Sequence, residues 1–492
     1  MRSGCGLPRS CGYLASAHLL TWSSVERRGS ELAFNEASFL AFITGAAVLF
    51  HVMPVAFWRR GVLLGANAAF LASFGSAAAL TPVLAFTAAC MLAILAVAHQ
   101  PRLAAAALIA LVLLFALLRG YFPFWEPPRA VTTIGMSYVL FRTLQVVLNL
   151  RDDVLRPEDV PPAKLALFLT SFLTLGAGPI QWYEEFASQL ARSERLRLGD
   201  VDPRAVFGRA VGGFAKLIVL APLVSAAYDE AVRASWPTGC RIGISAALFL
   251  LWIYVNFSGY MDVVIGLGRV FGFDLPENFD RPDRTTSFLD LWSRWHITLS
   301  RTFLTYMFNP LVATMLRRRW VSGPIAAGAA SYLVVFTLVG WWHGPDVRFA
   351  LMGFLFGVAA VVNKLSQAAR QRWPILKFRS PFGPTISGGI ALGACAIAAV
   401  PSWPLFQSVG EAVAAFRSPY DAAIAFLVAC GAGCLARVLG QLGDAVAGTA
   451  LRGTTWRAAT SPVVLGLIAA LLSSVALARS VDLPAIAYYQ RF

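Results

Sequence analysis

The sequence IGISAALFLLWIYVNFSGYMDVVIGLGRVF, residues 242–271, decides the fold class. It carries only two charged residues, Asp262 and Arg269, within a long run of apolar and aromatic side chains. A helix needs about 20 mainly apolar residues to cross the hydrocarbon core of a bilayer. A strand at that depth would expose unpaired backbone groups to lipid. The segment therefore predicts a membrane-spanning helix.

Comparable apolar runs recur along the whole chain. Its 492 residues are 58% hydrophobic and 14% charged, whereas a soluble domain carries about a quarter charged residues. That leaves too little polar surface for a water-soluble particle. We predict an all-α polytopic membrane protein with about 11 to 13 transmembrane helices plus interfacial or re-entrant helices. The runs begin near Ala37, Gly61, Thr81, Leu103, Val131, Ala163, Val206, Ile242, Gly323, Phe349, Thr385, Asp421 and Ser461.

The excess of basic residues indicates contact with lipid. The net charge is +15, and basic clusters at residues 58–60, 317–319 and 370–372 lie between apolar runs. The positive-inside bias and anionic headgroups produce this placement. We expect membrane lipids as partners and no nucleic acid.

The seven cysteines predict neither a disulfide framework nor a metal site. None forms a Cys-x-x-Cys pair, and most lie in apolar runs, where cysteine behaves as a small hydrophobic residue. Cys430 and Cys434 share a helix face, but two thiols without further ligands hold a metal poorly.

The chain divides into a short extension and one membrane domain. Residues 1–30 are rich in Gly, Ser, Cys and Arg, and their single apolar patch, residues 13–22, makes a poor signal peptide. We interpret residues 1–30 as a flexible extension or an over-called start. Residues 31–492 form the predicted membrane domain.

Residues 272–319 combine many charges with tryptophan, phenylalanine and leucine. Phe288, Trp292, Trp295 and Leu299 recur at helical spacing and predict one amphipathic helix. Such a helix lies at the membrane interface or enters a cavity lined by protein. A surface helix without chemistry explains the pattern equally well.

Only His296 and His343, of five histidines, have a setting that suggests chemistry. His18 lies in the extension, and we interpret His51 and His99 as structural. Glycines flank the segment around His343 and two tryptophans precede it, so the backbone can approach closely while indoles exclude water. A neutral imidazole there can accept a proton from a hydroxyl. The alternative is a histidine in a loop at a helix end.

Several charges inside apolar runs are candidates for supporting roles. Asp262 is costly within a span and needs a partner, which we expect to be Arg269, seven residues on along the same helix face. Arg142 and Lys216 are further intramembrane charges that can pair with acids on other helices. The chain has no Gly-x-Ser-x-Gly elbow and no phosphate loop. These residues fit an enzyme or a proton-coupled transporter.

The segments SGYMD (258–262), GFDLPENFDRP (272–282), WSRWHITLS (292–300) and WHG (342–344) resemble the membrane-bound O-acyltransferase family, in particular its bacterial alginate O-acetyltransferase-like branch. The resemblance is most specific in residues 256–345. It implies a ring of helices around a central channel, with His343 and His296 as the catalytic pair. The channel-lining or supporting residues would be Trp342, Trp295, Arg294, Asp262, Asn256, Tyr260 and Arg269.

The resemblance also implies the reaction. An acyl group, most simply acetyl, would pass from a cytoplasmic thioester such as acetyl-CoA or an acyl carrier toward hydroxyls of an exported polysaccharide. A separate periplasmic acyltransferase would be the partner, and the bacterial inner membrane the location. We expect no bound cofactor and no metal. The competing hypothesis is a transporter or flippase for a lipid-linked glycan, with the histidines as a proton relay.

Overall fold

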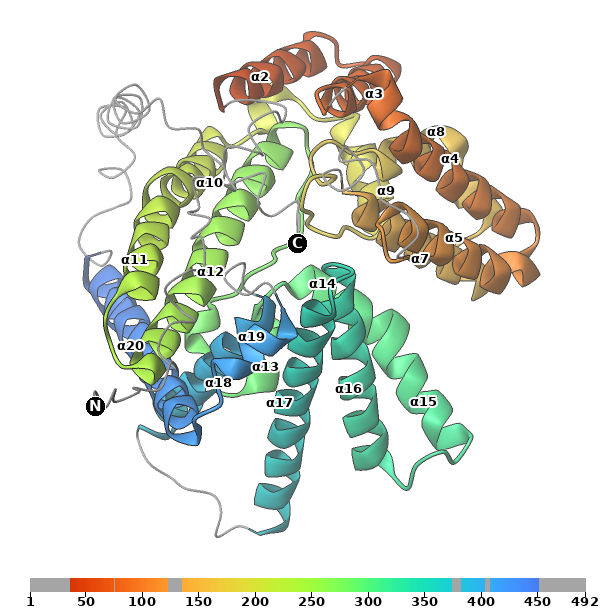
Figure 1. Ribbon diagram of the computed structural model, residues 1–492. Helices are drawn as coiled ribbons and strands as arrows, with labels where there is room; N and C mark the ends of the chain where they lie inside the picture. The colour runs from red at the N-terminus through yellow and green to blue at the C-terminus, as the bar shows by residue number, and fades with distance from the viewer. Residues whose placement is uncertain (1–35, 75, 123–134, 374–381, 403–407, 451–492) are drawn as a thin grey trace, which may run out of the picture.

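The computed structural model describes residues 36–74, 76–122, 135–373, 382–402 and 408–450, and this part of the chain is almost entirely helical (Figure 1). In the described residues the sole β-type pairing is an isolated bridge between Phe279 and Trp295. The helices are α2 (Glu36–Val52), α3 (Ala56–Ala72), α4 (Ala77–His99), α5 (Ala104–Leu118), α7 (Met136–Arg151), α8 (Pro162–Leu169), α9 (Tyr183–Ser193), α10 (Pro203–Ala215), α11 (Ala221–Arg233), α12 (Thr238–Val270), α13 (Phe288–Arg294), α14 (Ile297–Phe303), α15 (Asn309–Arg317), α16 (Pro324–Trp342), α17 (Val347–Arg372), α18 (Gly383–Ala399), α19 (Val409–Ala414) and α20 (Pro419–Ala450).

The predicted fold class is confirmed. Within the described residues, eight helical segments are long and apolar enough to span a membrane. They are Leu80–His99, Pro101–Leu118, Pro203–Arg233, Thr238–Val270, Pro324–Trp342, Val347–Arg372, Gly383–Ser402 and Pro419–Leu442. The segment Pro203–Arg233 joins α10 and α11 through a π-helical turn, Lys216–Leu220.

Other apolar runs form shorter elements. The run near Ala163 forms only α8, eight residues long, because a succession of turns follows it. The runs near Ala37, Gly61 and Val131 form α2, α3 and α7, which have 17, 17 and 16 residues. The run near Ser461 and the extension at residues 1–30 lie outside the described residues.

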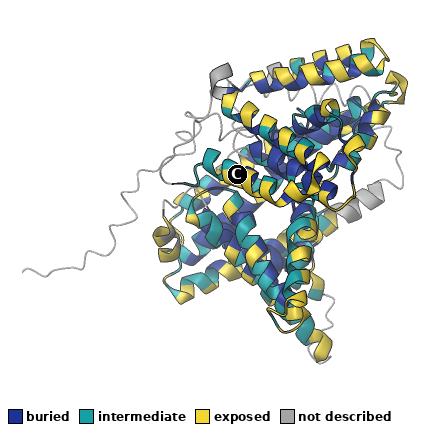
Figure 2. Cartoon of the chain, turned by 90° about the vertical axis from the view of Figure 1, so that its right-hand side faces the viewer, coloured by how far each residue is buried: buried dark blue, intermediate teal, exposed yellow. Residues whose placement is uncertain are grey.

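Two large hydrophobic clusters share the long helix α12. Its C-terminal half contributes Phe257 and Met261 to a cluster with α2–α9, and its N-terminal half contributes Phe249 and Trp252 to a cluster with α11, α13, α17 and α18. In Figure 1 the helices follow one another around the molecule, with α2 and α3 at the top, α4–α9 on the right and α10–α12 on the left. Figure 2 shows the buried residues gathered inside, with exposed ones along the outer faces. The predicted ring is consistent with this arrangement, and a central channel stays a prediction.

The segment 288–299 is not one helix, contrary to our expectation. It forms α13 and α14, separated at Trp295 and His296. His296 has a left-handed backbone, with φ at +46°, which a continuous α-helix does not contain. The aromatic residues do recur at helical spacing in the sequence. However, backbone hydrogen bonds to residues 278–280 interrupt the helix.

The hairpin of α16 and α17 brings two glycines into direct contact. A Cβ atom added at Gly340 would lie 2.3 Å from the carbonyl oxygen of Phe349, and one added at Gly353 would lie 2.2 Å from that of Phe336. Real Cβ atoms do not approach so closely, so the helices meet backbone to backbone. This contact closes the hairpin at the end that carries His343.

We predict that Gly340→Ala lowers the stability of the protein, by about 1–3 kcal/mol, because the added methyl group overpacks the contact between the helices. Gly328→Ala on the same helix is the matched control, since nothing lies within 4 Å of its added Cβ. Residual monodisperse protein after heating in detergent measures the effect. Equal melting of the two variants would contradict the backbone contact.

Candidate active site

His296 is buried at the junction between α13 and α14. His296 is 6% exposed, and its ring packs edge-on against the ring of Phe257, with the centroids 4.8 Å apart. Among the described residues, none offers a hydrogen bond to its Nδ1 atom. A buried imidazole nitrogen without a protein partner needs a hydrogen bond from a water or a ligand.

Asn278 holds the chain around His296. The backbone N–H of Ile297 donates to the carbonyl oxygen of Asn278 at 3.0 Å. The side-chain Oδ1 of Asn278 accepts bonds from the backbone N–H of Thr298 at 3.0 Å and from its hydroxyl at 2.7 Å. Asp280 N–H donates to the carbonyl oxygen of Arg294 at 3.0 Å. These bonds satisfy the first turn of α14 and fix the left-handed residue that precedes it.

A loop between α8 and α9 completes this side of the site. The N–H of Ile180 donates to the Thr298 hydroxyl at 3.0 Å, and the N–H of Ala177 donates to the Tyr260 hydroxyl at 3.2 Å. Gly178 has φ at +89°, and a Cβ there would lie 2.9 Å from the ring of Tyr138. The loop therefore joins α12 and α7 to the start of α14.

His343 caps the C-terminus of α16 and is half-buried. Its ring lies 4.7 Å from that of Trp342 and 6.4 Å from that of Phe349, measured between centroids. Trp342 in turn packs 5.3 Å from Phe141, where the first large cluster meets a smaller one built on α7, α14 and α16. His343 is therefore held among aromatic rings, as its tryptophan and glycine context indicated.

The two histidines lie near enough to affect each other electrostatically. Burial in the first place, and the charge of His343 in the second, lower the pKa of His296 to about 3. Since this pKa lies below its usual value, the neutral imidazole is the form present between pH 5 and 8. In this range the uncharged ring of His296 can donate or accept a hydrogen bond.

The prediction that Asp262 pairs with Arg269 is wrong. The carboxylate of Asp262 bonds Lys216 at 2.6 Å and Arg209 at 3.1 Å, both on the neighbouring helical segment Pro203–Arg233. Arg269, at the end of α12, instead reaches Asp274 at 4.0 Å. A shared helix face did not decide the pairing, because Gly213 and Gly259 let the two helices approach closely enough for Lys216 to reach Asp262.

Arg142 is paired differently from our expectation. It is 1% exposed, and within the described chain no carboxylate forms an ion pair with it. Its guanidinium donates to the carbonyl oxygens of Phe168 and Leu169 and to the hydroxyl of Thr174. Backbone carbonyls at the end of a short helix thus solvate this buried cation.

Three further predicted residues, Asn256, Trp295 and Arg294, lie on α12 and at the end of α13, and each has different contacts. Asn256 is buried in α12, one residue before Phe257. Trp295 packs against Tyr254 and Phe279. Arg294 pairs with Asp280 and Asp290, which fixes the end of α13. Sequence reasoning missed the roles of Asn278, Thr298 and Tyr138, although Asn278 stands in the PENF segment that carried the resemblance.

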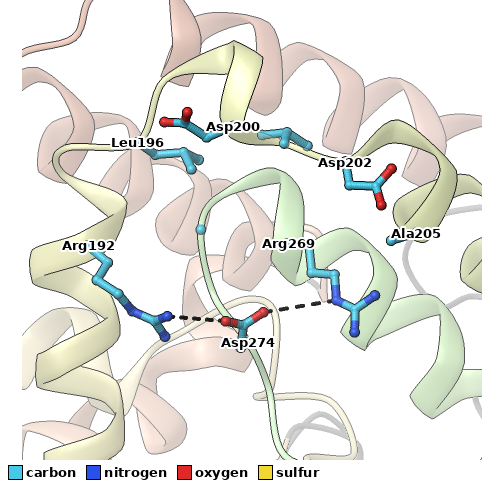
Figure 3. A pocket seen from close by; sticks show the side chains of 9 residues that line it. Arg192, Leu196, Asp200, Asp202, Ala205, Arg269 and Asp274 are labelled. Carbon is cyan, nitrogen blue, oxygen red and sulfur yellow. Dashed lines mark hydrogen bonds and ion pairs between the residues drawn. The ribbon is translucent and has the colours of Figure 1, made fainter.

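One surface cavity is lined by neither His296 nor His343 (Figure 3). Its volume is about 340 Å³, and it opens between α9, the start of α10 and the end of α12. Figure 3 shows Arg192 and Arg269 pointing toward Asp274 from opposite sides. Among the described residues, no group of three His, Cys, Asp or Glu side chains is placed to hold a metal ion.

Comparisons with known proteins identify the family of this chain. The model of the membrane-bound O-acyltransferase family, MBOAT, matches residues 93–397. A teichoic acid D-alanyltransferase of Bacillus subtilis is 26% identical over 48% of this chain and 60% of its own length. A peptidoglycan O-acetyltransferase of Helicobacter pylori is 30% identical over 42% of this chain and 38% of its own. A probable alginate O-acetylase of Pseudomonas aeruginosa is 27% identical over 47% and 42%. The chain thus matches between about two fifths and three fifths of each relative.

We predict that Asn278→Ala destabilises the protein by about 1–3 kcal/mol, because the buried hydroxyl of Thr298 and its backbone N–H both lose their acceptor. Asn363→Ala is the control. Asn363 also accepts from a backbone N–H, that of Leu289, but at 3.4 Å, so the loss there is smaller. Thermal unfolding in detergent measures both variants. A smaller loss at Asn278 than at Asn363 would contradict its role.

We predict that Asp262→Asn lowers the melting temperature, since it leaves Lys216 and Arg209 facing a neutral amide inside the span. Lys216→Met in the same chain should recover most of the loss, because it removes the unpaired ammonium group. Comparing the two single variants with the double variant measures the coupling. Strict additivity would mean that the pair does not interact.

Proposed function

Because this chain belongs to the membrane-bound O-acyltransferase family, we propose that it transfers an acyl group from a thioester donor to hydroxyls of an exported polysaccharide. The observation that carries this proposal is the pair formed by His343 and His296. One imidazole is half-buried among aromatic rings, and the other is fully buried, neutral and open at Nδ1. Such a pair suits acyl transfer, in which one group moves a proton and the other meets a carbonyl oxygen.

In the proposed reaction, His343 acts as general base. It takes the proton of the acceptor hydroxyl while the oxygen attacks the thioester carbonyl carbon. The neutral His296 donates a hydrogen bond to the carbonyl oxygen, which gains negative charge. The C–S bond then breaks, and the thiolate recovers the proton from His343. The products are an ester and a free thiol.

Aromatic side chains exclude water from this reaction. Trp342 lies beside His343, and Trp295 directly precedes His296. Excluding water strengthens each polar interaction and limits hydrolysis of the thioester. The carboxylates of Asp262 and Asp290 form ion pairs with Lys216 and Arg294.

The names of the relatives support the substrate classes that we propose. They act on teichoic acid, peptidoglycan and alginate, as their names state. For this chain we infer an extracytoplasmic glycan as acceptor, acetyl-CoA or another acyl thioester as donor, and a periplasmic acyltransferase as partner. The protein is a multi-pass membrane protein, and we place it in the bacterial inner membrane in contact with its lipids.

We predict that His343→Ala lowers thioester consumption by purified protein about 10²–10⁴-fold, the usual effect of losing a general base. His99→Ala is the matched control, because His99 is an exposed histidine at the end of α4. Release of free thiol from acetyl-CoA, with and without a polysaccharide acceptor, is the measurement. D-alanyl thioesters and thioesters with longer acyl chains are tested as donors in parallel reactions.

Two results would contradict the proposed function. A wild-type protein that leaves every thioester untouched but moves a lipid-linked glycan across vesicles would be a flippase. A His343→Ala variant with full polymer acylation in cells would remove His343 from the chemistry.

A further inference from the structure

A tyrosine far away in the sequence binds the helix end that carries His343. The hydroxyl of Tyr121 donates to the carbonyl oxygen of Trp341 at 2.7 Å and approaches that of Trp342 at 3.2 Å. Tyr121 follows α5 and stands 220 residues before Trp341. Neither the apolar runs nor the segments that resemble the family include this residue.

The hydroxyl of Tyr121 binds carbonyl groups at the C-terminus of α16, where a helix needs donors from outside. The last carbonyl groups of a helix have no donor within the helix and depend on other partners. At the end of α16 the backbone supplies two bonds, from His343 to Gly340 and from Gly344 to Trp341. Tyr121 adds a side-chain donor to the last two carbonyls of the helix, directly before His343.

Tyr121 is itself held by neighbouring rings. Its ring lies edge-on to that of Trp341, with centroids 5.5 Å apart, and 6.5 Å from that of Phe115. Phe115 is buried in the first large cluster, on α5. The contact therefore joins the packed N-terminal helices to the last turn of α16.

We propose that Tyr121 is a positioning residue for His343. Its hydroxyl fixes the last turn of α16, so the imidazole points in one direction beside Trp342. Loss of the hydroxyl lets this turn fray and spreads the imidazole over several orientations. A general base that deviates from its productive geometry loses rate although it remains present. The effect on catalysis rests on the proposed function, whereas the effect on the imidazole does not.

A tyrosine beside an exposed tryptophan also suits the aromatic belt of a membrane interface. In that case the ring matters and the hydroxyl does not affect His343. Tyr121→Phe keeps the ring and removes only the donor. Tyr183→Phe is the matched control, because the Tyr183 hydroxyl also donates to a backbone carbonyl, that of Asp159 at 2.6 Å, away from the histidines.

The first measurement is the reaction of His343 with diethyl pyrocarbonate, followed by mass spectrometry and normalised to His99 in the same sample. We expect His343 to react about two- to fivefold faster in Tyr121→Phe than in wild type. Loss of one hydrogen bond raises the population of the frayed last turn by about that factor. Tyr183→Phe should react like wild type. This measurement needs no enzymatic activity.

The second measurement is thioester turnover. We expect kcat to fall about three- to tenfold in Tyr121→Phe with KM unchanged, because the donor site is intact and the base is misplaced. Tyr183→Phe should keep the wild-type kcat even where its melting temperature falls. If wild type shows no turnover, the proposed function fails, and the modification rate alone decides about Tyr121.

The inference is overturned if His343 reacts at the wild-type rate in Tyr121→Phe. It is also overturned if both tyrosine variants change His343 reactivity and kcat by the same factor, because a general loss of stability then explains the change. A faster reaction confined to Tyr121→Phe supports it.

Discussion

The bonds that Asn278 makes to Ile297 and Thr298 are the interaction on which the site depends. They hold His296 in a left-handed conformation that a non-glycine residue adopts only when its surroundings impose it. The break between α13 and α14 places the imidazole of His296 against the ring of Phe257. The backbone N–H of Ile180 donates to the hydroxyl of Thr298, so the loop between α8 and α9 and the Asn278 segment meet at the start of α14.

Charge within the apolar chain imposes a second constraint, and the protein meets it in two ways. Asp262 is paired with Lys216 and Arg209, and Arg209 also bonds Glu277, the residue before Asn278. This network connects the crossing of α10 and α12 to the segment that holds His296. Arg142 is instead surrounded by carbonyl oxygens. In both cases a charge within an apolar helix costs too much free energy to remain without polar contacts.

Local patterns in the sequence predicted the elements well where one helix accounts for the pattern. The run at residues 242–271 lies in α12, and the runs at Gly323 and Phe349 form α16 and α17. The same reasoning failed at residues 288–299, where a segment far away in sequence breaks the helix, and near Ala163, where turns end an apolar run after eight residues. Periodicity reports which residues share a face of a helix, but it does not report what that face meets.

The sequence by itself determined the class of the protein, since twenty or more apolar residues in repeated runs leave helices across a membrane as the stable arrangement. The residues around His343, and the resemblance of both segments to the family, also made His343 and His296 the predicted catalytic pair. Only the tertiary structure decided the partners. Asp262 pairs with Lys216 and not Arg269, Arg142 bonds carbonyls, and Tyr121 reaches the end of α16. The physical reason is that each pairing depends on which helices lie close together, and that distance is set by packing across the whole chain.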